Sequence, residues 1–342
     1  MLMTPEEIAP AVECANRLLT ELDRILLGHH EIHRLVLMGI LSRGHILLEG
    51  LPGVGKTALV KALGQLLDLE FKRVQFTPDL LPSDILGGSI LQMGEDGQRH
   101  LAFQPGPIFA NIVLADEINR ASPKTQAAML EAMQERCVTL LGVTRPLPAP
   151  FFVLASQNPI ELEGTYPIPE AQLDRFMFKL EVSGVDAEVL TQIITERRRG
   201  EPPAPSWSLK KEELEGLFAA MERISLSQAV AAYIAKLVAV SQPNAVDGIE
   251  EVTRYLAYGP SPRAAIAMAE AARAAALLAG RPTVGFEDVK AIAPWVLNHR
   301  LLLNYQARLE KITSLELVLR LLEKVDPAAI SLPKGFSGEA EA

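Results

Sequence analysis

Short runs of apolar residues alternate with stretches of helical periodicity over the first half of the chain. The runs with β-type composition are residues 46–48, 71–76, 112–114, 151–155 and 177–182. An alternation of this kind is typical of a parallel sheet that is covered by helices. The pattern therefore predicts an α/β fold for this part of the protein.

The pattern changes after Ser183. From there on, segments rich in Ala, Leu and Glu follow with helical spacing, such as residues 209–224, and no further β-type run is evident. We predict an α/β core over residues 1–183 and an all-α domain over residues 184–334. The small and acidic residues 335–342 are predicted to form a flexible tail.

Two stretches interrupt the predicted core with hairpin-like patterns. The first surrounds Gly-Glu-Asp-Gly at residues 94–97, and the second surrounds Leu-Gly at residues 141–142. We expect hairpin insertions near residues 88–106 and 137–149. The pattern alone also allows ordinary surface loops at both places.

Composition narrows the functional class. Of 342 residues, 49% are hydrophobic and 22% are charged, which is close to the usage of a folded globular protein. Lys and Arg total 33 against 42 Asp and Glu, a formal net charge of -9. This acidic balance disfavours non-specific binding of nucleic acid over the whole surface, although a locally basic pore stays possible.

The cysteines and the first residues bear on the compartment. Cys14 and Cys137 are the only cysteines and form no C-x-x-C spacing, which fits a reducing compartment. Glu6 and Glu7 stand where a signal peptide requires a basic start. No uncharged apolar run reaches the length of a membrane span. We expect a cytoplasmic protein.

Residues 50–57 read Gly-Leu-Pro-Gly-Val-Gly-Lys-Thr and match the phosphate-loop pattern G-x-x-x-x-G-K-S/T between a predicted strand and a helical stretch. Glycines let backbone amides curl toward an anion, and the helix N-terminus adds partial positive charge. We predict that Lys56 reaches the β- and γ-phosphates of a nucleotide and that the Thr57 hydroxyl ligates Mg²⁺. The predicted nucleotide-binding residues here are Gly50, Pro52, Gly53, Val54, Gly55, Lys56, Thr57 and Ala58.

Two acidic residues follow the apolar strand at residues 112–114. Asp116 stands where the magnesium-holding aspartate of a phosphate-loop enzyme is expected, and Glu117 is our candidate for the general base that polarises the attacking water. Alone, an apolar strand followed by acids is a common helix-start pattern. Its combination with the phosphate loop makes the interpretation specific.

Missing motifs exclude other phosphate-loop classes. The chain has neither the Asn-Lys-x-Asp motif of GTPases nor the Leu-Ser-Gly-Gly-Gln signature of transporters. The apolar run at residues 151–156 ends at Gln157-Asn158-Pro159, which could bring the Asn158 amide between Glu117 and the γ-phosphate. An ordinary Asn-Pro turn is the alternative.

Taken together, these motifs resemble those of MoxR-family AAA+ ATPases over roughly residues 28–300. The stretches that carry the resemblance are residues 48–53, 115–121, 126–135, 157–159, 169–176 and 261–264. The resemblance implies a phosphate-loop αβα core with a helical lid, Mg-ATP hydrolysis to ADP and phosphate, and assembly into a ring, expected to be a hexamer. It also implies chaperone-like remodelling or maturation of partner proteins, often through a partner with a von Willebrand factor A domain.

The resemblance also implies three catalytic roles. Asn158 corresponds to sensor 1, Arg263 to sensor 2 on the lid, and Arg175 to an arginine finger that reaches a neighbouring subunit's nucleotide. Ser261 can cap a helix that starts at Pro262, which leaves Arg263 in the first turn, an unfavourable place for a cation without an anionic partner. An exposed first-turn arginine is the alternative.

Two other arginines allow more than one interpretation. Arg175 could instead form a surface ion pair with Asp174 or Glu170, which would contribute little to stability. Arg120 follows the acidic pair and could lie at a subunit interface or form an internal salt bridge.

Residues 25–29 resemble the segment that lines the adenine pocket in this family. Backbone groups of Leu27 or Gly28 could contact the base. Family members usually have Gln where this chain has His29, so a side-chain contact is left open. His29 and His33 lie one helical turn apart, with His30 and Glu31 between them, and allow a metal site, although solvated or core histidines are commoner.

The two predicted hairpins resemble the helix-2 and pre-sensor-1 insertions of the same clade and are expected at the pore or partner face of the ring. Related clades with these hairpins include nucleic-acid remodelling motors. A motor of that kind and a magnesium-chelatase-like motor subunit are alternative functions. A scaffold that binds ATP with little turnover is a further alternative.

Overall fold

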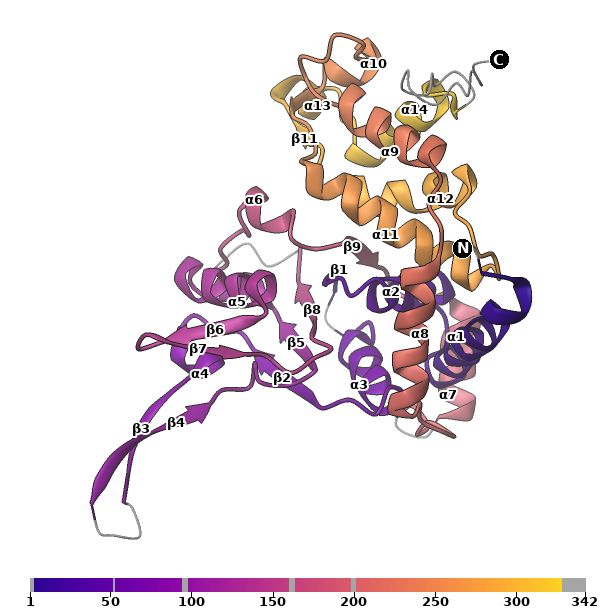
Figure 1. The fold of residues 1–342 in the computed structure, drawn as a ribbon. Coiled ribbons are helices and arrows are strands. Elements are labelled where there is room, and N and C mark those ends of the chain that lie inside the picture. The colour runs from indigo at the N-terminus through magenta and orange to yellow at the C-terminus, as the bar shows by residue number, and fades with distance from the viewer. Residues whose placement is uncertain (1–2, 52, 94–97, 160–163, 198–200, 328–342) are drawn as a thin grey trace, which may run out of the picture. The chain divides into compact units, whose positions relative to one another are not determined.

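The computed structural model describes residues 3–51, 53–93, 98–159, 164–197 and 201–327 (Figure 1). The predicted tail lies outside the described residues. Within the described part of the chain, every helix is too short or too polar to cross a lipid bilayer.

Contacts between residues group the chain into two compact units. The core unit is formed by Asn16–Glu215, and the helical unit combines Met1–Ala15 with Gly216–Ala342. Residue 183, the predicted boundary, therefore lies inside the core unit. The segment that follows it packs on the core, because a Cβ added to Gly28 would lie 3.0 Å from Val185 Cγ1 and 3.3 Å from Val189 Cγ1.

A parallel five-stranded sheet forms the centre of the core unit, which confirms the predicted α/β fold. Its order is β2-β5-β8-β1-β9, and every neighbouring pair is parallel. The strands are β1 (Ile46–Gly50), β2 (Phe71–Gln75), β5 (Ile112–Asp116), β8 (Phe152–Gln157) and β9 (Phe178–Val182). The carboxyl ends of β1, β5 and β8 meet at one edge of the sheet.

Helices cover both faces of this sheet (Figure 1). The helices of this part of the chain are the long α1 (Pro5–Ile25), α2 (His30–Leu41), α3 (Lys56–Leu66), α4 (Pro82–Leu86), η1 (Ile118–Arg120), α5 (Pro123–Glu135), α6 (Glu170–Leu173) and α7 (Ala187–Glu196). Val113 and Val153 pack with Met129 and Met133 of α5 in one buried cluster. Successive residues of a strand face opposite sides of the sheet, so the residues next to Val113 and Val153 are buried on the face opposite α5.

Two antiparallel hairpins interrupt the core unit, at the places where the sequence predicts them. They are β3 (Gly87–Met93) with β4 (Arg99–Pro105), and β6 (Cys137–Leu140) with β7 (Val143–Pro146). Leu141 and Gly142 form the second turn, both with positive φ, at 51° and 76°. This geometry is that of a two-residue hairpin turn. The turn of the first hairpin, residues 94–97, lies outside the described residues.

The rest of the described chain is mainly helical, as predicted. Its elements are α8 (Lys211–Arg223), α9 (Gln228–Val240), α10 (Glu250–Thr253), α11 (Pro262–Leu278), α12 (Phe286–Leu297), α13 (Tyr305–Leu309) and α14 (Ser314–Lys324). One short ribbon departs from the all-α expectation, where β10 (Leu256–Tyr258) pairs with β11 (Leu302–Leu303). Asn304 supports the ribbon, since its Nδ2 donates to the Arg254 carbonyl at 2.7 Å.

His45 is buried between two backbone groups of the core. Its Nδ1 accepts a hydrogen bond from the Val153 N–H at 3.0 Å, so its Nε2 is the nitrogen that donates to the Met133 carbonyl at 3.1 Å. Burial lowers the pKa of His45 to about 4, although the bond to Met133 opposes the shift. A proton on Nδ1 would face another donor, so the folded state keeps this imidazole neutral.

We expect acid to destabilise the core through His45. The unfolded chain takes up this proton near its ordinary pKa of about 6.5, whereas the folded chain takes it up near pH 4. The contribution of His45 to the free energy of unfolding is therefore complete above the pKa of the unfolded chain. It is lost as pH falls through the pKa of the folded chain, and the total loss is about 3 kcal/mol. Urea unfolding of the wild type and His45→Gln across this range measures it. Parallel pH profiles of the two proteins would contradict the assignment.

Candidate functional site

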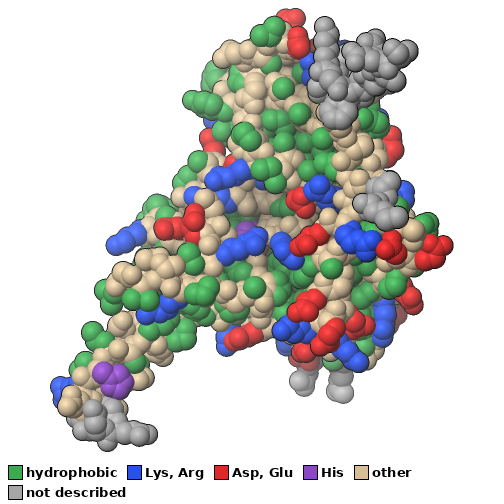
Figure 2. All heavy atoms as spheres, in the orientation of Figure 1, with side chains coloured by type: hydrophobic (Ala, Val, Ile, Leu, Met, Phe, Trp, Pro, Cys, Tyr) green, Lys and Arg blue, Asp and Glu red, His purple; other side chains and the backbone are tan. Residues whose placement is uncertain are grey.

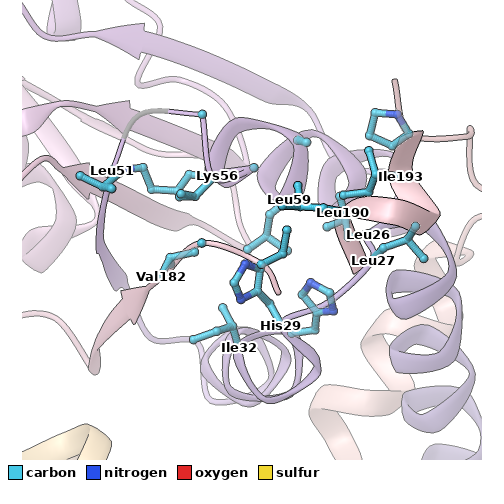
Figure 3. A pocket seen from close by; sticks show the side chains of 18 of the residues that line it. Leu26, Leu27, His29, Ile32, Leu51, Lys56, Leu59, Val182, Leu190 and Ile193 are labelled. Carbon is cyan, nitrogen blue, oxygen red and sulfur yellow. The ribbon is translucent and has the colours of Figure 1, made fainter. Parts of the chain in front are cut away.

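A pocket of about 520 Å³ lies in the core unit, between the phosphate loop, the start of α2 and the helix α7. Figure 3 shows Leu51 and Lys56 on one side of it and Leu190 and Ile193 on the other. Val182 and Leu59 contribute further apolar surface. One end of the pocket thus offers a cation and backbone amides, and the other offers aliphatic walls.

The phosphate loop has the backbone freedom that the motif predicts. Gly53 and Gly55 have φ values of 83° and 91°, a left-handed conformation that favours glycine, and an added Cβ would meet open space at both. Gly50 has a different reason to lack a side chain, because an added Cβ would lie 2.3 Å from the Val182 carbonyl oxygen of β9. Pro52 lies outside the described residues, and Val54 lines the pocket.

Lys56 begins α3 and turns back into its own loop. Its Nζ donates to the Gly50 carbonyl at 2.5 Å. Burial lowers the pKa of Lys56, while Asp116, Glu117 and Glu49 act in the opposite direction. The ammonium is therefore held inside the loop, and the negative charges of the two predicted catalytic acids, Asp116 and Glu117, favour its protonated form.

The N-terminus of α3 is open to an anion. Its N-cap, Gly55, supplies no side-chain hydrogen bond, so the first amides of the helix depend on another acceptor. Thr57 is exposed in this first turn, and Ala58 is half-buried and lines the pocket. These features fit the predicted contacts with phosphate.

Asp116 ends β5 within a network that sequence reasoning missed. Ser156 Oγ donates to Asp116 Oδ1 at 2.5 Å and accepts from the Glu117 N–H at 2.9 Å. Arg73 donates to Asp116 Oδ2 from Nε at 3.0 Å and from Nη2 at 2.7 Å. The parallel order of β2, β5 and β8 is the signal that could have found them, because Ser156 stands near the end of β8 and Arg73 lies in β2 two residues before Gln75, the residue in register with Asp116.

The chemistry of these residues fits a magnesium ion. Thr57 offers a hydroxyl oxygen and Asp116 a carboxylate, which are the hard oxygen donors that Mg²⁺ prefers. Ser156 orients the carboxylate in the way that hydrogen bonds orient metal ligands elsewhere. Arg73 competes for Oδ2, so magnesium binding at this carboxylate would have to share or displace the guanidinium.

Glu117 adopts a strained backbone conformation next to Asp116. Its φ of 56° and ψ of 49° lie in the left-handed region, which is uncommon for a residue with a side chain. Gln75 Nε2 donates to Glu117 Oε2 at 2.8 Å, and Arg120 Nε lies 3.2 Å from the same oxygen. Of the two interpretations of Arg120, the described chain has the internal salt bridge.

Asn158 lies just beyond β8, at the edge of the sheet where Asp116 and Glu117 end β5. It is buried, and its carbonyl accepts from Asn119 Nδ2 at 3.5 Å. Because β8 runs between β1 and β5, the strand order puts Asn158 between the phosphate loop and the acidic pair.

Arg175 points back onto its own subunit. Its Nη1 donates to the Leu130 carbonyl of α5 at 2.9 Å. Its Nε is buried and has no hydrogen-bond partner within the described chain. Arg263 belongs to the helical unit, where it is exposed in the first turn of α11 and its N–H donates to Ser261 Oγ at 3.1 Å.

The start of α2 lines the apolar end of the pocket. Leu27 and His29 are both lining residues. Gly28, with a φ of 76°, bends the chain between them. His29 Nε2 is buried without a partner in the described part of the chain, and burial, more than the neighbouring His30, lowers the pKa of His29. A neutral imidazole with an unsatisfied nitrogen therefore lies at this end.

Comparisons with family models agree with the geometry. A model described as "ATPase family associated with various cellular activities (AAA)" matches residues 45–178, which include the phosphate loop and both acids. A model described as "AAA lid domain" matches residues 250–320 of the helical unit.

Several proteins are similar to the chain over most of its length. Chaperone MoxR1 of Mycobacterium tuberculosis is 41% identical, covering 94% of this chain and 84% of that protein. YeaC of Bacillus subtilis is 41% identical over 89% of this chain and 92% of its own. Protein MoxR of Methylorubrum extorquens is 31% identical over 85% and 88%. A crystal structure of a candidate ATPase from Cytophaga hutchinsonii superimposes with a TM-score of 0.84 at 38% identity, covering 94% of this chain and 97% of that one.

Proposed function

The chain belongs to the MoxR family of AAA+ ATPases, and we propose that it binds Mg-ATP in the core pocket and hydrolyses it to ADP and phosphate. One arrangement carries this proposal. The open glycine turn with Lys56 at the start of α3 lies within electrostatic reach of Asp116 and Glu117. A triphosphate bound at this helix N-terminus would meet amide donors, an ammonium and a candidate base together.

In this proposal, each residue of the site has a separate role. Lys56 would leave the Gly50 carbonyl to hold the β- and γ-phosphates, and Thr57 and Asp116 would hold magnesium, which would supply positive charge to the phosphate oxygens. Glu117 takes a proton from the attacking water, and Gln75 fixes its carboxylate in orientation. Asn158 positions the same water from the end of β8. Leu27, Gly28 and His29 form the adenine end of the pocket.

Hydrolysis requires more than one subunit in this proposal. Arg175 would leave Leu130 to neutralise transition-state charge at the nucleotide of the next subunit, and Arg263 would contact the phosphates from the lid. The assembly that provides this geometry is a ring, which we propose to be a hexamer in the cytoplasm. Changes in nucleotide state would then remodel a partner protein, with one that carries a von Willebrand factor A domain as the leading candidate.

The β3–β4 hairpin favours a protein partner over nucleic acid. Leu91, Met93 and Leu101 are 60%, 71% and 69% exposed on it. Figure 2 shows apolar side chains along this projection, coloured green. Exposed aliphatic surface is suited to a protein client, whereas a nucleic-acid motor would present cations along the strand path.

Calorimetry with Lys56→Ala tests the nucleotide-binding part of the proposal. We expect Mg-ATP to bind the wild type and the affinity of the variant to fall by about 100-fold, since an ionic hydrogen bond to phosphate contributes roughly 3 kcal/mol. Lys61→Ala is the matched control, because Lys61 is an exposed lysine of the same helix. Equal affinities of the two variants, or no binding by the wild type, would refute the proposal.

A further inference from the structure

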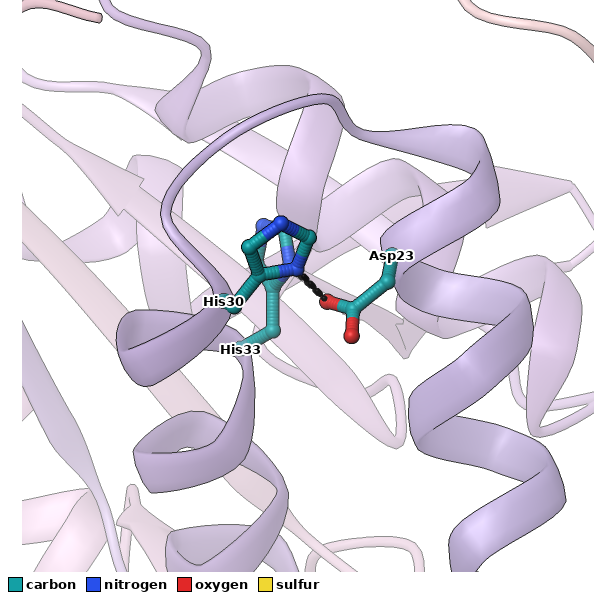
Figure 4. Close-up of side chains that lie close together, drawn as sticks. All are labelled: Asp23, His30 and His33. Carbon is teal, nitrogen blue, oxygen red and sulfur yellow. Dashed lines mark hydrogen bonds and ion pairs between the residues drawn. The ribbon is translucent and has the colours of Figure 1, made fainter.

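Three side chains of the types that ligate metals meet beside the core pocket, outside the residues assigned to ATP. Asp23, near the end of α1, His30 and His33 each offer a ligand atom, and these atoms all lie within 4.8 Å of one another. Asp23 Oδ1 is 2.7 Å from His33 Nδ1 and 3.1 Å from His30 Nδ1. Figure 4 shows both imidazoles on the first turn of α2, facing the Asp23 carboxylate. Glu31, the nearest acid in sequence, is not part of this group.

Two of the three ligand separations, those from Asp23 to the imidazoles, are close to the separations found around a bound transition metal. Zinc holds imidazole nitrogen and carboxylate oxygen at about 2.0 to 2.2 Å, so tetrahedral ligand atoms lie roughly 3.3 Å apart. The observed separations of 2.7 and 3.1 Å are slightly shorter. A small outward movement of His30 would open the group, and the His30 side chain is 70% exposed.

The charges also favour a cation. The Asp23 carboxylate brings negative charge to the group, and the His33 side chain beside it is only 3% exposed. One carboxylate and two imidazoles leave a fourth position for water, which is the ligand set of an open zinc site.

We propose that Asp23, His30 and His33 bind a divalent transition-metal ion, with Zn²⁺ the best match, and that this ion ties α1 to α2. The two imidazoles are borderline ligands, which suit zinc better than the hard cations that oxygen-only sites take, and zinc also accepts a carboxylate oxygen. His33 also lines the nucleotide pocket. The ion would thus bind at the rim of that pocket, distinct from the magnesium proposed at Thr57 and Asp116.

Zinc titration of the nucleotide-free protein tests the proposal independently of ATP. We expect the wild type to bind one ion per chain and to unfold at a higher temperature when zinc is present, because a ligand of the folded state stabilises it. His30→Ala should weaken zinc binding by at least about 10-fold, since losing even an outer-shell partner costs that much. Because His30 is exposed, this variant should keep its fold.

Three further measurements establish whether these side chains themselves hold the ion. His100→Ala removes an exposed histidine from β4 and should leave zinc binding unchanged. Asp23→Asn should weaken it, as His30→Ala does. Cobalt substitution should give the visible absorption of a nitrogen and oxygen site without thiolate charge transfer, which excludes Cys14 and Cys137. Zinc uptake that is equal in His30→Ala and the wild type, or absent from the wild type, would overturn the proposal.

Discussion

Replacing Arg175 by alanine is expected to lower ATP turnover by about 10³- to 10⁵-fold while nucleotide affinity stays near that of the wild type. The proposed reason is that Arg175 acts on a neighbouring subunit's nucleotide and does not hold its own. The buried Nε without a partner in the described chain is consistent with a group that finds its acceptor elsewhere. Phosphate release and calorimetry measure the two quantities separately.

A structural contribution of Arg175 has to be separated from this effect. Its bond to the Leu130 carbonyl contributes to stability, and losing it should cost about 1 kcal/mol. Arg34→Ala is the matched control, because Arg34 is an exposed arginine of α2. A large drop in turnover with unchanged affinity, and an unfolding temperature lowered only by the few degrees that a loss of about 1 kcal/mol explains, supports the proposed role.

Mixing two inactive variants provides the decisive measurement. An Arg175→Ala subunit keeps an intact site, whereas a Glu117→Gln subunit keeps an intact arginine. If Arg175 acts across a subunit boundary, a mixture of the two should recover turnover that neither shows alone. A mixture as inactive as its components, under conditions where the subunits assemble, would assign Arg175 to its own subunit.

Replacing Glu117 by glutamine is expected to lower turnover by about 10²- to 10⁴-fold with little change in Mg-ATP affinity. The amide cannot take the proton of the attacking water, yet it is nearly isosteric with the carboxylate. It can still contact Gln75, whereas the ion pair with Arg120 is lost.

The control for this variant is Glu131→Gln, an exposed glutamate on α5. It should keep wild-type turnover and affinity. Turnover by Glu117→Gln that equals the wild type would remove Glu117 from the role of base. Undetectable turnover by the wild type, under conditions of assembly, would instead favour an ATP-binding scaffold.

Much of the fold could be predicted because its signals are local. Apolar runs at residues 46–48 and 112–114 form β1 and β5, and the hairpin turn at Leu141 and Gly142 occurs where its residues indicate. The boundary of the core was harder to predict, because α7 has helical spacing but packs on Gly28. The spacing of apolar residues shows that a helix has one buried face, but it does not show whether that face packs on the α/β core or on the helical unit.

The sequence by itself determined the phosphate loop and the acidic pair, since each is contiguous and its chemistry follows from residue order. Only the tertiary structure decided which groups surround them. Arg73 and Ser156 contact Asp116 from 43 and 40 residues away in the chain. Asp23 contacts His33 because the chain between α1 and α2 reverses direction and brings the two helices together. Hydrogen bonds and metal ligation act over about 3 Å, so partners far apart in the chain become visible only when packing brings them together.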